Sequence, residues 1–285
     1  MFKINSLLTL FLFVILSSTI VCKPTNIIKG HGNIITEERK INGFSKIEVL
    51  GSINVEIILG NTYKIYVSDY ENLIPLLTTK KQGKKLKITY EGSIRESRGK
   101  VKIVMPQLQE IKSIGSGDIN VKGRISGRDK FEIFSLGSGD ITINGEIVGF
   151  KSMDISLKGS GDLSLSAQVQ DIDVNYSVLG SGDGELRFFG NIKNIKVNSL
   201  GSGDINFIGD SADKAKIVIL GSGDVNFKEI KINEVKAKIL GSGDCYFNVV
   251  NFLEAEILGS GNIHIKGKAE EMILKTNNSG SVKYQ

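Results

Sequence analysis

The composition of this 285-residue chain, with 40% hydrophobic and 24% charged residues, is that of a globular protein and excludes a largely disordered one. Glycine is frequent (33 residues) and proline rare (3), which excludes collagen, because collagen needs glycine at every third position and much more proline. The net charge of +5 is small and is spread along the predicted strands. A nucleic-acid-binding protein would gather positive charge on one face, so we expect no nucleic-acid partner.

Residues 1–22 predict a signal peptide. Lys3 precedes an apolar run from Leu7 to Leu16, and this run is too short to cross a bilayer comfortably. Cleavage is expected after Cys22, with Thr19 as the alternative position. A lipid anchor on Cys22 is a further alternative, although the residues before it are larger than those that bacterial lipoprotein processing prefers. Each alternative predicts an exported protein, either secreted or held at the cell surface or envelope.

Residues 23–106 are expected to form the N-terminal part of the fold, with an irregular insertion at about 60–106. Alternation of apolar and polar residues predicts three strands in it: Tyr63–Ser68, Leu86–Tyr90 and Val101–Met105. A short helix is expected over Glu71–Leu77 despite Pro75. We interpret the insertion as a non-repeating layer at the N-terminal end of a repeat structure, because such structures need a cap there.

A dense basic cluster surrounds Gly83 in this insertion: Lys80, Lys81, Lys84, Lys85 and Lys87. One hypothesis is a patch that binds an anionic ligand, such as a charged glycan or a phosphate-bearing polymer. The alternative is a solvated hairpin whose lysines discourage its edge from pairing with another strand. The sequence favours the hairpin.

Residues 107–285 contain a regular repeat that is marked by the tetrapeptide Gly-Ser-Gly-Asp. The tetrapeptide begins at Gly115, Gly137, Gly159, Gly180, Gly201, Gly221 and Gly241, and Gly-Ser-Gly-Asn begins at Gly259. The successive spacings are 22, 22, 21, 21, 20, 20 and 18 residues. Repeats of this length are typical of solenoids, in which each unit buries its apolar face only against its neighbours.

Each repeat unit contains two stretches of strict alternation, one before and one after the tetrapeptide. In one unit the apolar residues before it are Met153, Ile155 and Leu157, and those after it are Leu163 and Leu165. A period of two indicates strands with one apolar face. Equivalent strands one repeat apart are then expected to pair in parallel, about 4.8 Å from each other. The sequence therefore predicts an all-β fold, a single-stranded parallel β-helix (solenoid) with about 20 residues per turn. An antiparallel sandwich is the competitor, but its hairpins would not need an identical corner in every repeat.

The tetrapeptide predicts a tight corner between the two strands of each unit. Glycine tolerates positive φ, and aspartate accepts hydrogen bonds from the amides of a turn. The corner column consists of Asp118, Asp140, Asp162, Asp183, Asp204, Asp224, Asp244 and Asn262. Carboxylates about 4.8 Å apart repel by roughly 1 kcal/mol even in water, and calcium would relieve this repulsion. Capping of the turns is favoured over calcium binding, and no other cofactor is expected.

Several other positions carry expectations. The residues before the corners should stack along the edge: Leu136, Leu179, Leu200, Leu220, Leu240 and Leu258. Gly184 stands where an apolar side chain belongs, so we expect an underfilled or bulged rung there. Cys245 occupies an inward position, which predicts a buried and inert thiol. The only histidines, His31 and His264, lie near opposite ends of the chain, so no shared metal or catalytic site is expected.

Three segments resemble the head GIN domain proteins of bacteria: Phe44–Val49, Ser52–Ile57 and Met105–Ile111, the last of which leads into the first Gly-Ser-Gly-Asp. The resemblance covers roughly residues 30–285. It implies an exported, β-helical surface protein, since these proteins are described as heads of auto-transporter adhesins. Their molecular activity is unknown, so the resemblance transfers no catalytic or binding residue to this chain.

These observations favour an adhesin-like binding protein without catalysis, whose partner is a surface glycan or protein. Regular outward ladders of a solenoid offer long faces for such partners. One alternative is a structural, envelope-associated scaffold, and self-association through the C-terminal edge of the solenoid is expected as a further interaction. Another is a polysaccharide-active β-helix enzyme, which needs irregular loops that bring unlike residues together. Residues 107–285 have no insertion that is large enough for this.

Overall fold

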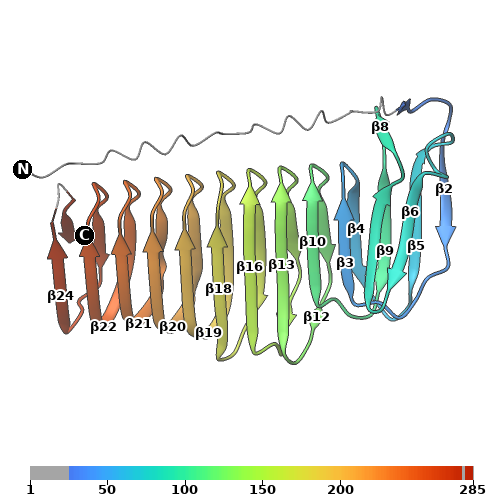
Figure 1. The fold of residues 1–285 in the computed structure, drawn as a ribbon. Helices are drawn as coiled ribbons and strands as arrows, with labels where there is room; N and C mark the ends of the chain where they lie inside the picture. The colour runs from blue at the N-terminus through green and yellow to red at the C-terminus, as the bar shows by residue number, and fades with distance from the viewer. Residues whose placement is uncertain (1–25, 278–279, 285) are drawn as a thin grey trace, which may run out of the picture.

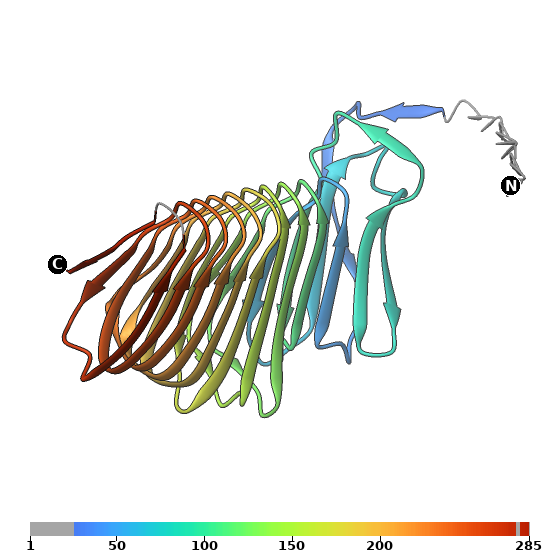
Figure 2. The same ribbon diagram turned by 60° about the vertical axis from the view of Figure 1, so that its left-hand side comes forward.

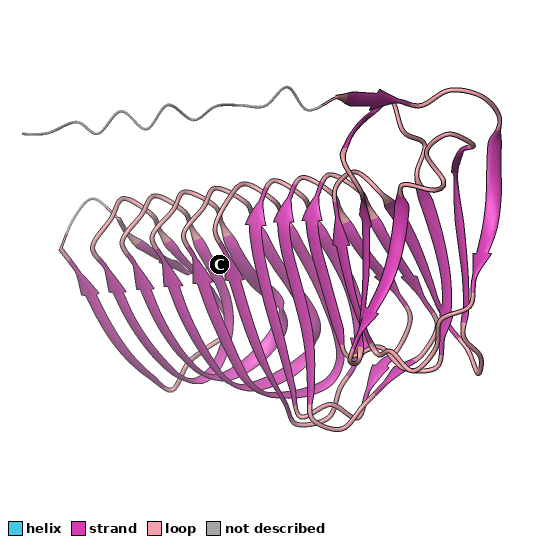
Figure 3. Ribbon diagram, turned by 45° about the vertical axis from the view of Figure 1, so that its right-hand side comes forward, coloured by secondary structure: helices cyan, strands magenta, loops and turns pink. Residues whose placement is uncertain are grey.

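The computed structural model describes residues 26–277 and 280–284, and the regular elements of this part of the chain are all strands (Figure 3). The predicted signal peptide and Cys22 lie outside the described residues. The helix expected over residues 71–77 is wrong: the segment forms consecutive turns, with Ile74 N–H donating to Tyr70 O and Leu77 N–H donating to Leu73 O, both at 3.0 Å. Pro75 has no N–H to donate, so the hydrogen bonding of a helix cannot continue through it.

The chain coils into a parallel β-solenoid, which confirms the predicted fold (Figures 1 and 2). Strands that precede the corners form one face: β3 (Lys46–Leu50), β10 (Glu110–Gly115), β13 (Lys130–Gly137), β16 (Ser152–Gly159) and β18 (Ile172–Val178). Strands that follow the corners form the opposite face: β4 (Asn54–Leu59), β11 (Ile119–Lys122), β14 (Ile141–Asn144) and β17 (Leu163–Gln168). Equivalent residues pair in register, as Ile111 does with Ile133 and Ile133 with Ile155.

Later turns contain longer strands. Each runs from the second face around a bend into the first face of the next turn: β19 (Gly184–Ser199), β20 (Ile205–Ile219), β21 (Val225–Ile239) and β22 (Cys245–Ile257). Three shorter strands complete the C-terminal end: β23 (Ile263–Lys266), β24 (Glu271–Thr276) and β25 (Val282–Tyr284). β24 extends the first face and β25 extends the second.

The inward residues of both faces form one continuous apolar core. Phe188, Phe207, Phe227 and Phe247 stack along it, with ring centroids 5.9, 4.7 and 5.9 Å apart. The underfilled or bulged rung expected at Gly184 is wrong. Gly184 keeps the regular register with Leu163 and Ile205. The hydroxyl of the buried Tyr176 fills the space, since a Cβ added to Gly184 would lie 2.0 Å from it.

The width of the turns changes along the axis. The 22-residue turns have a short third face, made by the parallel pair β12 (Ile125–Ser126) and β15 (Ile147–Val148). The shorter turns that follow have too few residues for this face, and their strands bend directly from one main face to the other. Shortening of the repeat therefore produces a step on the side of the solenoid opposite the corners (Figure 1).

Residues 26–106, which we call the cap, are arranged differently. β7 (Lys85–Tyr90) pairs in parallel with β3, and β9 (Lys100–Met105) pairs in parallel with β4, so the insertion lies on the outer side of the β3/β4 turn. Antiparallel strands then complete this end. β5 (Lys64–Tyr70) lies between β2 (Ile34–Arg39) and β9, and β6 (Leu77–Gln82) pairs with β7. β1 (Ile27–Lys29) and β8 (Ser93–Arg95) form a separate parallel pair.

A buried carboxylate organises the cap. Asp69 is fully buried and accepts hydrogen bonds from the N–H of Tyr70 at 2.8 Å, the N–H of Arg98 at 2.7 Å and the hydroxyl of Tyr90. Burial raises the pKa of the Tyr90 hydroxyl, and the hydrogen bond to Asp69 adds to this shift, so the hydroxyl remains a donor. A single carboxylate thus fixes the loop that leads from β8 to β9.

An ion network on the outer face joins the cap to the first turns. Glu110 on β10 contacts Lys46 on β3 at 2.7 Å and Lys85 on β7 at 3.3 Å. Glu48 on β3 contacts Lys112 on β10 at 2.7 Å. The hydrogen bond from Lys112 lowers the pKa of Glu48 in spite of its partial burial.

Candidate functional site

The corner aspartates form a hydrogen-bonded ladder along one edge of the solenoid. The Oδ1 atom of each accepts the backbone N–H of the equivalent residue in the next turn, at distances between 2.6 and 3.1 Å. The acceptors of the ladder start at Asn54 and run through Asp118, Asp140, Asp162, Asp183, Asp204, Asp224 and Asp244 to Asn262, whose Oδ1 accepts the N–H of Ser281 at 3.2 Å. The aspartates therefore cap the neighbouring turn instead of their own.

The corner glycines allow successive turns to stack closely. A Cβ at Gly221 would lie 1.7 Å from the carbonyl oxygen of Gly201, although Gly221 does not have a positive φ. Gly137 does have a positive φ, +151°, and its Cβ would lie 1.9 Å from the carbonyl oxygen of Gly115. The expectation that positive φ explains the first glycine of each tetrapeptide holds only for the first four copies, which begin at Gly115, Gly137, Gly159 and Gly180. Contact with the backbone of the preceding turn is common to all of them.

Calcium binding at the ladder stays a prediction. The Oδ1 atoms already accept backbone N–H groups, which leaves the Oδ2 atoms for any ion. Within residues 26–277 and 280–284, no three acidic, histidine or cysteine side chains converge in a way that could hold a metal. At the C-terminal end of the ladder, His264 Nε2 lies 3.0 Å from Asp244 Oδ2. Burial raises the pKa of Asp244, but hydrogen bonds from Asn262 and His264 outweigh burial and hold this pKa below its usual range.

The leucines before the corners form a column that faces solvent, which we call the leucine column. Leu179, Leu200 and Leu220 are 52%, 47% and 50% exposed. The residues just before them pair in register from turn to turn, as Ser199 does with Ile219, so the leucines follow one another along the edge. Leu136 and Leu240 are also exposed, and Lys158 interrupts the column between Leu136 and Leu179.

The five lysines around Gly83 do not form one patch. Lys80 and Lys87 are paired across β6 and β7 on the outer face, whereas Lys81 pairs with Leu86 and so lies on the other side of the hairpin. Lys80 contacts Glu91 at 2.7 Å, and Lys85 belongs to the ion network with Glu110. Lys84 is exposed at the turn. The anionic-ligand hypothesis would need these groups to converge.

The remaining predicted positions are placed apart. His31 lies in the cap, where its backbone N–H donates to Asn72 Oδ1 at 2.9 Å, and His264 lies on the second face near the C-terminal end. Cys245 is fully buried, and burial raises the pKa of its thiol. The thiol is therefore protonated at neutral pH and unreactive.

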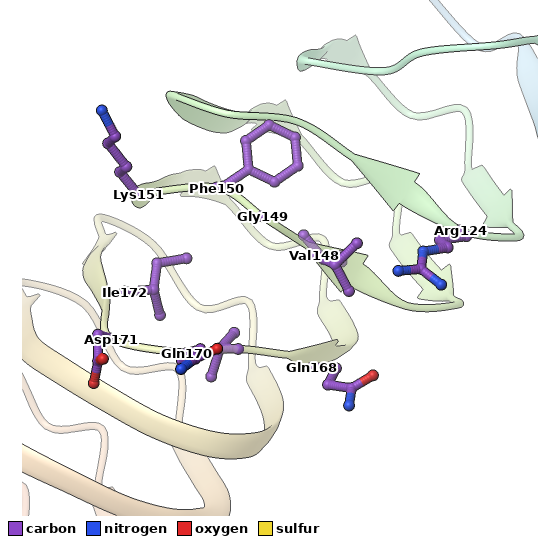
Figure 4. Close-up of a pocket in the computed structure, with 11 residues that line it drawn as sticks. Arg124, Val148, Gly149, Phe150, Lys151, Gln168, Gln170, Asp171 and Ile172 are labelled. Atoms are coloured by element: carbon purple, nitrogen blue, oxygen red, sulfur yellow. The ribbon is translucent and has the colours of Figure 1, made fainter.

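The step contains a hollow of about 470 Å³, which the sequence analysis did not identify (Figure 4). It forms where the third face ends at β15 and the loop of residues 169–171 crosses below it. Its polar side chains come from three successive turns: Arg124, Lys151, Gln168, Gln170 and Asp171. The signal in the sequence was the fall in repeat length from 22 to 21 residues, because a change of width exposes the edge of the wider layer.

The side chains around the step hollow offer both donors and acceptors. Among the described residues, no hydrogen-bond or ion-pair partner is found for the side chains of Lys151, Gln168 and Gln170, whereas Arg124 contacts Glu146 at 3.5 Å. Asp171 has a positive φ of +54°, which is uncommon for a residue with a side chain, and its Oδ1 accepts a hydrogen bond from Asn191 Nδ2 at 2.9 Å. Strained backbone of this kind is concentrated at functional sites.

A second hollow, of about 710 Å³, lies where the cap meets the second face. Tyr66 and three lysines contribute to its lining. Two of these lysines are already paired: Lys102 contacts Glu56 at 3.5 Å and Lys122 contacts the same carboxylate at 2.7 Å. The step hollow differs in that it interrupts the regular repeat surface and takes its polar side chains from three successive turns.

The parallel turns, the cap at the N-terminal end and the regular outer ladders place this chain in the class of β-solenoid proteins. The chain belongs to the family described as "Putative auto-transporter adhesin, head GIN domain", whose model matches residues 43–187 and 176–269. The family resemblance noted in the sequence is thereby confirmed.

Solved bacterial structures share the fold. A protein described as a putative lipid binding protein from Parabacteroides distasonis ATCC 8503 is 25% identical, with a TM-score of 0.67 over 91% of this chain and 99% of that one. A putative adhesin from Parabacteroides merdae ATCC 43184 is 21% identical, with a TM-score of 0.58 and the same coverage. A putative adhesin from Parabacteroides distasonis ATCC 8503 is 20% identical, with a TM-score of 0.64 over 91% of this chain and 100% of that one. No curated protein matches significantly.

Proposed function

We propose that this chain is a non-catalytic, adhesin-like protein that binds a surface glycan in the step hollow. The observation that carries the proposal is that Arg124, Lys151, Gln168 and Gln170 line a hollow that interrupts an otherwise regular surface. Membership of the adhesin family supports binding as the general activity.

The chemistry of the hollow suits a polyhydroxylated ligand. Sugar hydroxyls both donate and accept hydrogen bonds, and the side-chain amides of Gln168 and Gln170 can do the same. Lys151 adds a cation, and Arg124, which also contacts Glu146 at 3.5 Å, adds further donors; these groups would favour acidic sugars. The backbone around the hollow is held by hydrogen bonds to the next turn, from Val169 N–H to Phe189 O at 2.8 Å and from Asp171 N–H to Asn191 O at 2.9 Å, so little backbone entropy is lost on binding.

Catalysis is not part of this proposal. Glycoside hydrolases generally need two carboxyl groups at a defined separation around one glycosidic bond. Asp171 is the one carboxylate that lines the step hollow, and it already accepts a hydrogen bond from Asn191. The relatives named above are described as adhesins or a lipid binding protein. Reproducible release of reducing sugar from a bound polysaccharide would contradict this part of the proposal.

A glycan array tests the proposal. The purified chain should bind one class of bacterial envelope or host mucin glycans, and the double variant Gln168→Ala/Gln170→Ala should bind it about 10- to 100-fold more weakly, because two to four hydrogen bonds are lost. Gln107→Ala, an exposed glutamine outside the step, is the matched control and should bind normally. Equal loss in both variants, or no glycan bound, would contradict the proposal.

We also propose that the chain is exported and acts at the cell surface or envelope. The N-terminal sequence and the adhesin family support this location. No membrane-spanning helix is found among the residues that the structure describes. Fractionation of cells that express the chain should recover it outside the cytoplasm. Release of the Cys22→Ser variant from the envelope would reveal a lipid anchor, whereas an unchanged distribution would support cleavage.

A second candidate function, contact with a lipid surface, is favoured by the leucine column. Exposed leucines in a row, with Lys196 and Lys216 on the adjoining face, resemble the surfaces of peripheral membrane proteins. One structural relative is described as a putative lipid binding protein. If this function exists, the chain should sediment with phosphatidylethanolamine–phosphatidylglycerol vesicles, and the Leu200→Ser/Leu220→Ser variant should stay in the supernatant.

A further partner in the proposal is another copy of the chain. The sequence predicts self-association through the C-terminal edge, and within the described residues β24 and β25 each pair on one side only.

A further inference from the structure

The two ends of the solenoid differ in how their strand edges are protected. At the N-terminal end, the outermost strands β2 and β6 are antiparallel to their neighbours, and β6 carries Lys80 and Lys81. Charged residues on an edge strand discourage pairing with other chains. At the C-terminal end β24 is parallel to β22, and no described residue covers its other edge (Figure 1).

The uncovered end is apolar. Met272 and Leu274 occupy the inward positions of β24, where they are 38% and 36% exposed. Their equivalents one turn earlier, Leu253 and Ala255, are at most 1% exposed. Within the described residues, the core is therefore covered by a further layer in the turns before β24 and is left open at β24. Apolar surface at an open strand edge is the combination that most favours strand addition.

The outer face of β24 carries charges that match an antiparallel copy of itself. Its outward residues are Glu271, Ile273 and Lys275. When two β24 strands pair antiparallel with Ile273 opposite Ile273, Glu271 of each lies opposite Lys275 of the other. Met272 then lies opposite Leu274 on the inner side. Antiparallel registers displaced by one pair in either direction place no glutamate opposite a lysine.

From this match we infer that two copies of the chain join end to end as a dimer, through antiparallel pairing of their β24 strands centred on Ile273. This specifies the self-association proposed above and is independent of ligand binding at the step. The two-fold axis is normal to the first face and runs through the core towards β25, so the apolar ends of both copies cover each other. The pairing is isologous, and it stops at two copies because each cap closes the far end.

Opposite-charge reversals test the pairing. Glu271→Lys places lysine opposite lysine twice, and Lys275→Glu places glutamate opposite glutamate twice. Each single variant should dissociate at least about tenfold more readily than the unaltered chain, because cross-strand charge pairs become repulsive. An equimolar mixture of the two variants restores both attractive pairs, so it should form a heterodimer. Lys196→Glu, on the same face but far from the end, is the matched control and should leave the dimer intact.

Sedimentation velocity and light scattering of the purified chain give the readout, and the melting temperature of each variant shows that it is folded. We expect dimers of the unaltered chain at about 100 µM that dissociate on dilution. A monomer at this concentration, assemblies larger than a dimer, or a mixture of variants that stays monomeric would overturn the inference. Glycan binding by a monomer would leave the proposed function standing while the dimer fails.

Discussion

The cap and the repeat region use strands of the same kind but are stabilised in different ways. In the cap, single interactions are unique: one buried carboxylate, Asp69, fixes three groups from different segments. In the repeat region the same hydrogen bond recurs in turn after turn, and the glycine corners press backbone against backbone. The comparison teaches that a repeat tolerates the loss of one side-chain bond, whereas its backbone contacts leave no room for substitution.

The largest effect is expected when the backbone contact of the repeat is broken. In Gly221→Ala the new Cβ would lie 1.7 Å from the carbonyl oxygen of Gly201, so two turns must separate. We expect the free energy of unfolding to fall by about 3–5 kcal/mol. The control in the cap is Gly60→Ala, whose Cβ would meet only the Val104 Cγ1 at 3.1 Å, and its cost should stay below about 1 kcal/mol. Chemical denaturation measures both, and equal losses would contradict the comparison.

Removal of the unique carboxylate of the cap should have the next largest effect. Asp69→Ala leaves the N–H groups of Tyr70 and Arg98 without their acceptor, at an expected cost of about 3 kcal/mol. Tyr90→Phe removes one donor and leaves both N–H bonds, so its cost should be about 1–2 kcal/mol. Hydrogen exchange should show that the loss is confined to the cap. A uniform loss of hydrogen-exchange protection along the whole chain would argue against a separate role for Asp69.

A single rung of the corner ladder should matter less. Asp183→Ala removes the acceptor for the N–H of Asp204, and we expect a loss of about 1 kcal/mol. Asp183→Asn keeps an acceptor oxygen and removes one carboxylate from the column, so it should be neutral or slightly stabilising. The chain itself places asparagine at both ends of the ladder, at Asn54 and Asn262. A loss for the asparagine variant as large as that for alanine would show that the charge is needed.

Acid should weaken the junction between the two regions. The hydrogen bond from Lys112 lowers the pKa of Glu48, and hydrogen bonds from Lys46 and Lys85 lower that of Glu110 in spite of burial. A carboxyl group with a lowered pKa stabilises the fold above its unfolded pKa of about 4.3, and this contribution is lost as the pH falls through the folded pKa. Stability should therefore decrease below about pH 4.

The control for this pH dependence is the double variant Glu48→Gln/Glu110→Gln. The free energy of unfolding of this variant should fall less between pH 7 and pH 3 than that of the unaltered chain. The difference should be under about 1 kcal/mol, because both pairs are partly solvated. Denaturation curves at both pH values provide the measurement. Identical acid losses in the variant and the unaltered chain would exclude this network as a source.

The smallest effect is expected from calcium. The Oδ1 atoms of the ladder are occupied by N–H donors, so addition of calcium should shift the melting temperature by less than about 1 °C relative to a chelator. A larger rise that is lost in Asp183→Asn would establish calcium binding at the ladder.

The repeat region was predictable because its contacts are encoded locally and then repeated. Alternation in each unit fixes the inward residues, such as Ile155 and Leu157, and the constant spacing places equivalent residues one above the other. The aspartate column followed from the same spacing. What the sequence did not reveal is the partner of each aspartate, because turn chemistry alone gives no preference for the amide of the next turn.

Three features could not be predicted for a different reason. The antiparallel position of β5 between β2 and β9 depends on pairing between segments far apart in the chain. The filling of the space at Gly184 depends on the rotamer of Tyr176 in the preceding turn. The step hollow arises where the repeat shortens from 22 to 21 residues. This change leaves the tetrapeptide itself unaltered, yet it changes the shape of one side of the molecule.

The direction of the ladder hydrogen bonds bears on how the chain acquires its fold. Each aspartate accepts the amide of the turn that follows it, so a finished turn presents one side-chain acceptor at its corner before its successor has arrived. A polypeptide that emerges N-terminus first would find the cap already assembled as a starting template. Winding would then proceed in one direction, layer upon layer, with loop closure of only about twenty residues at each addition.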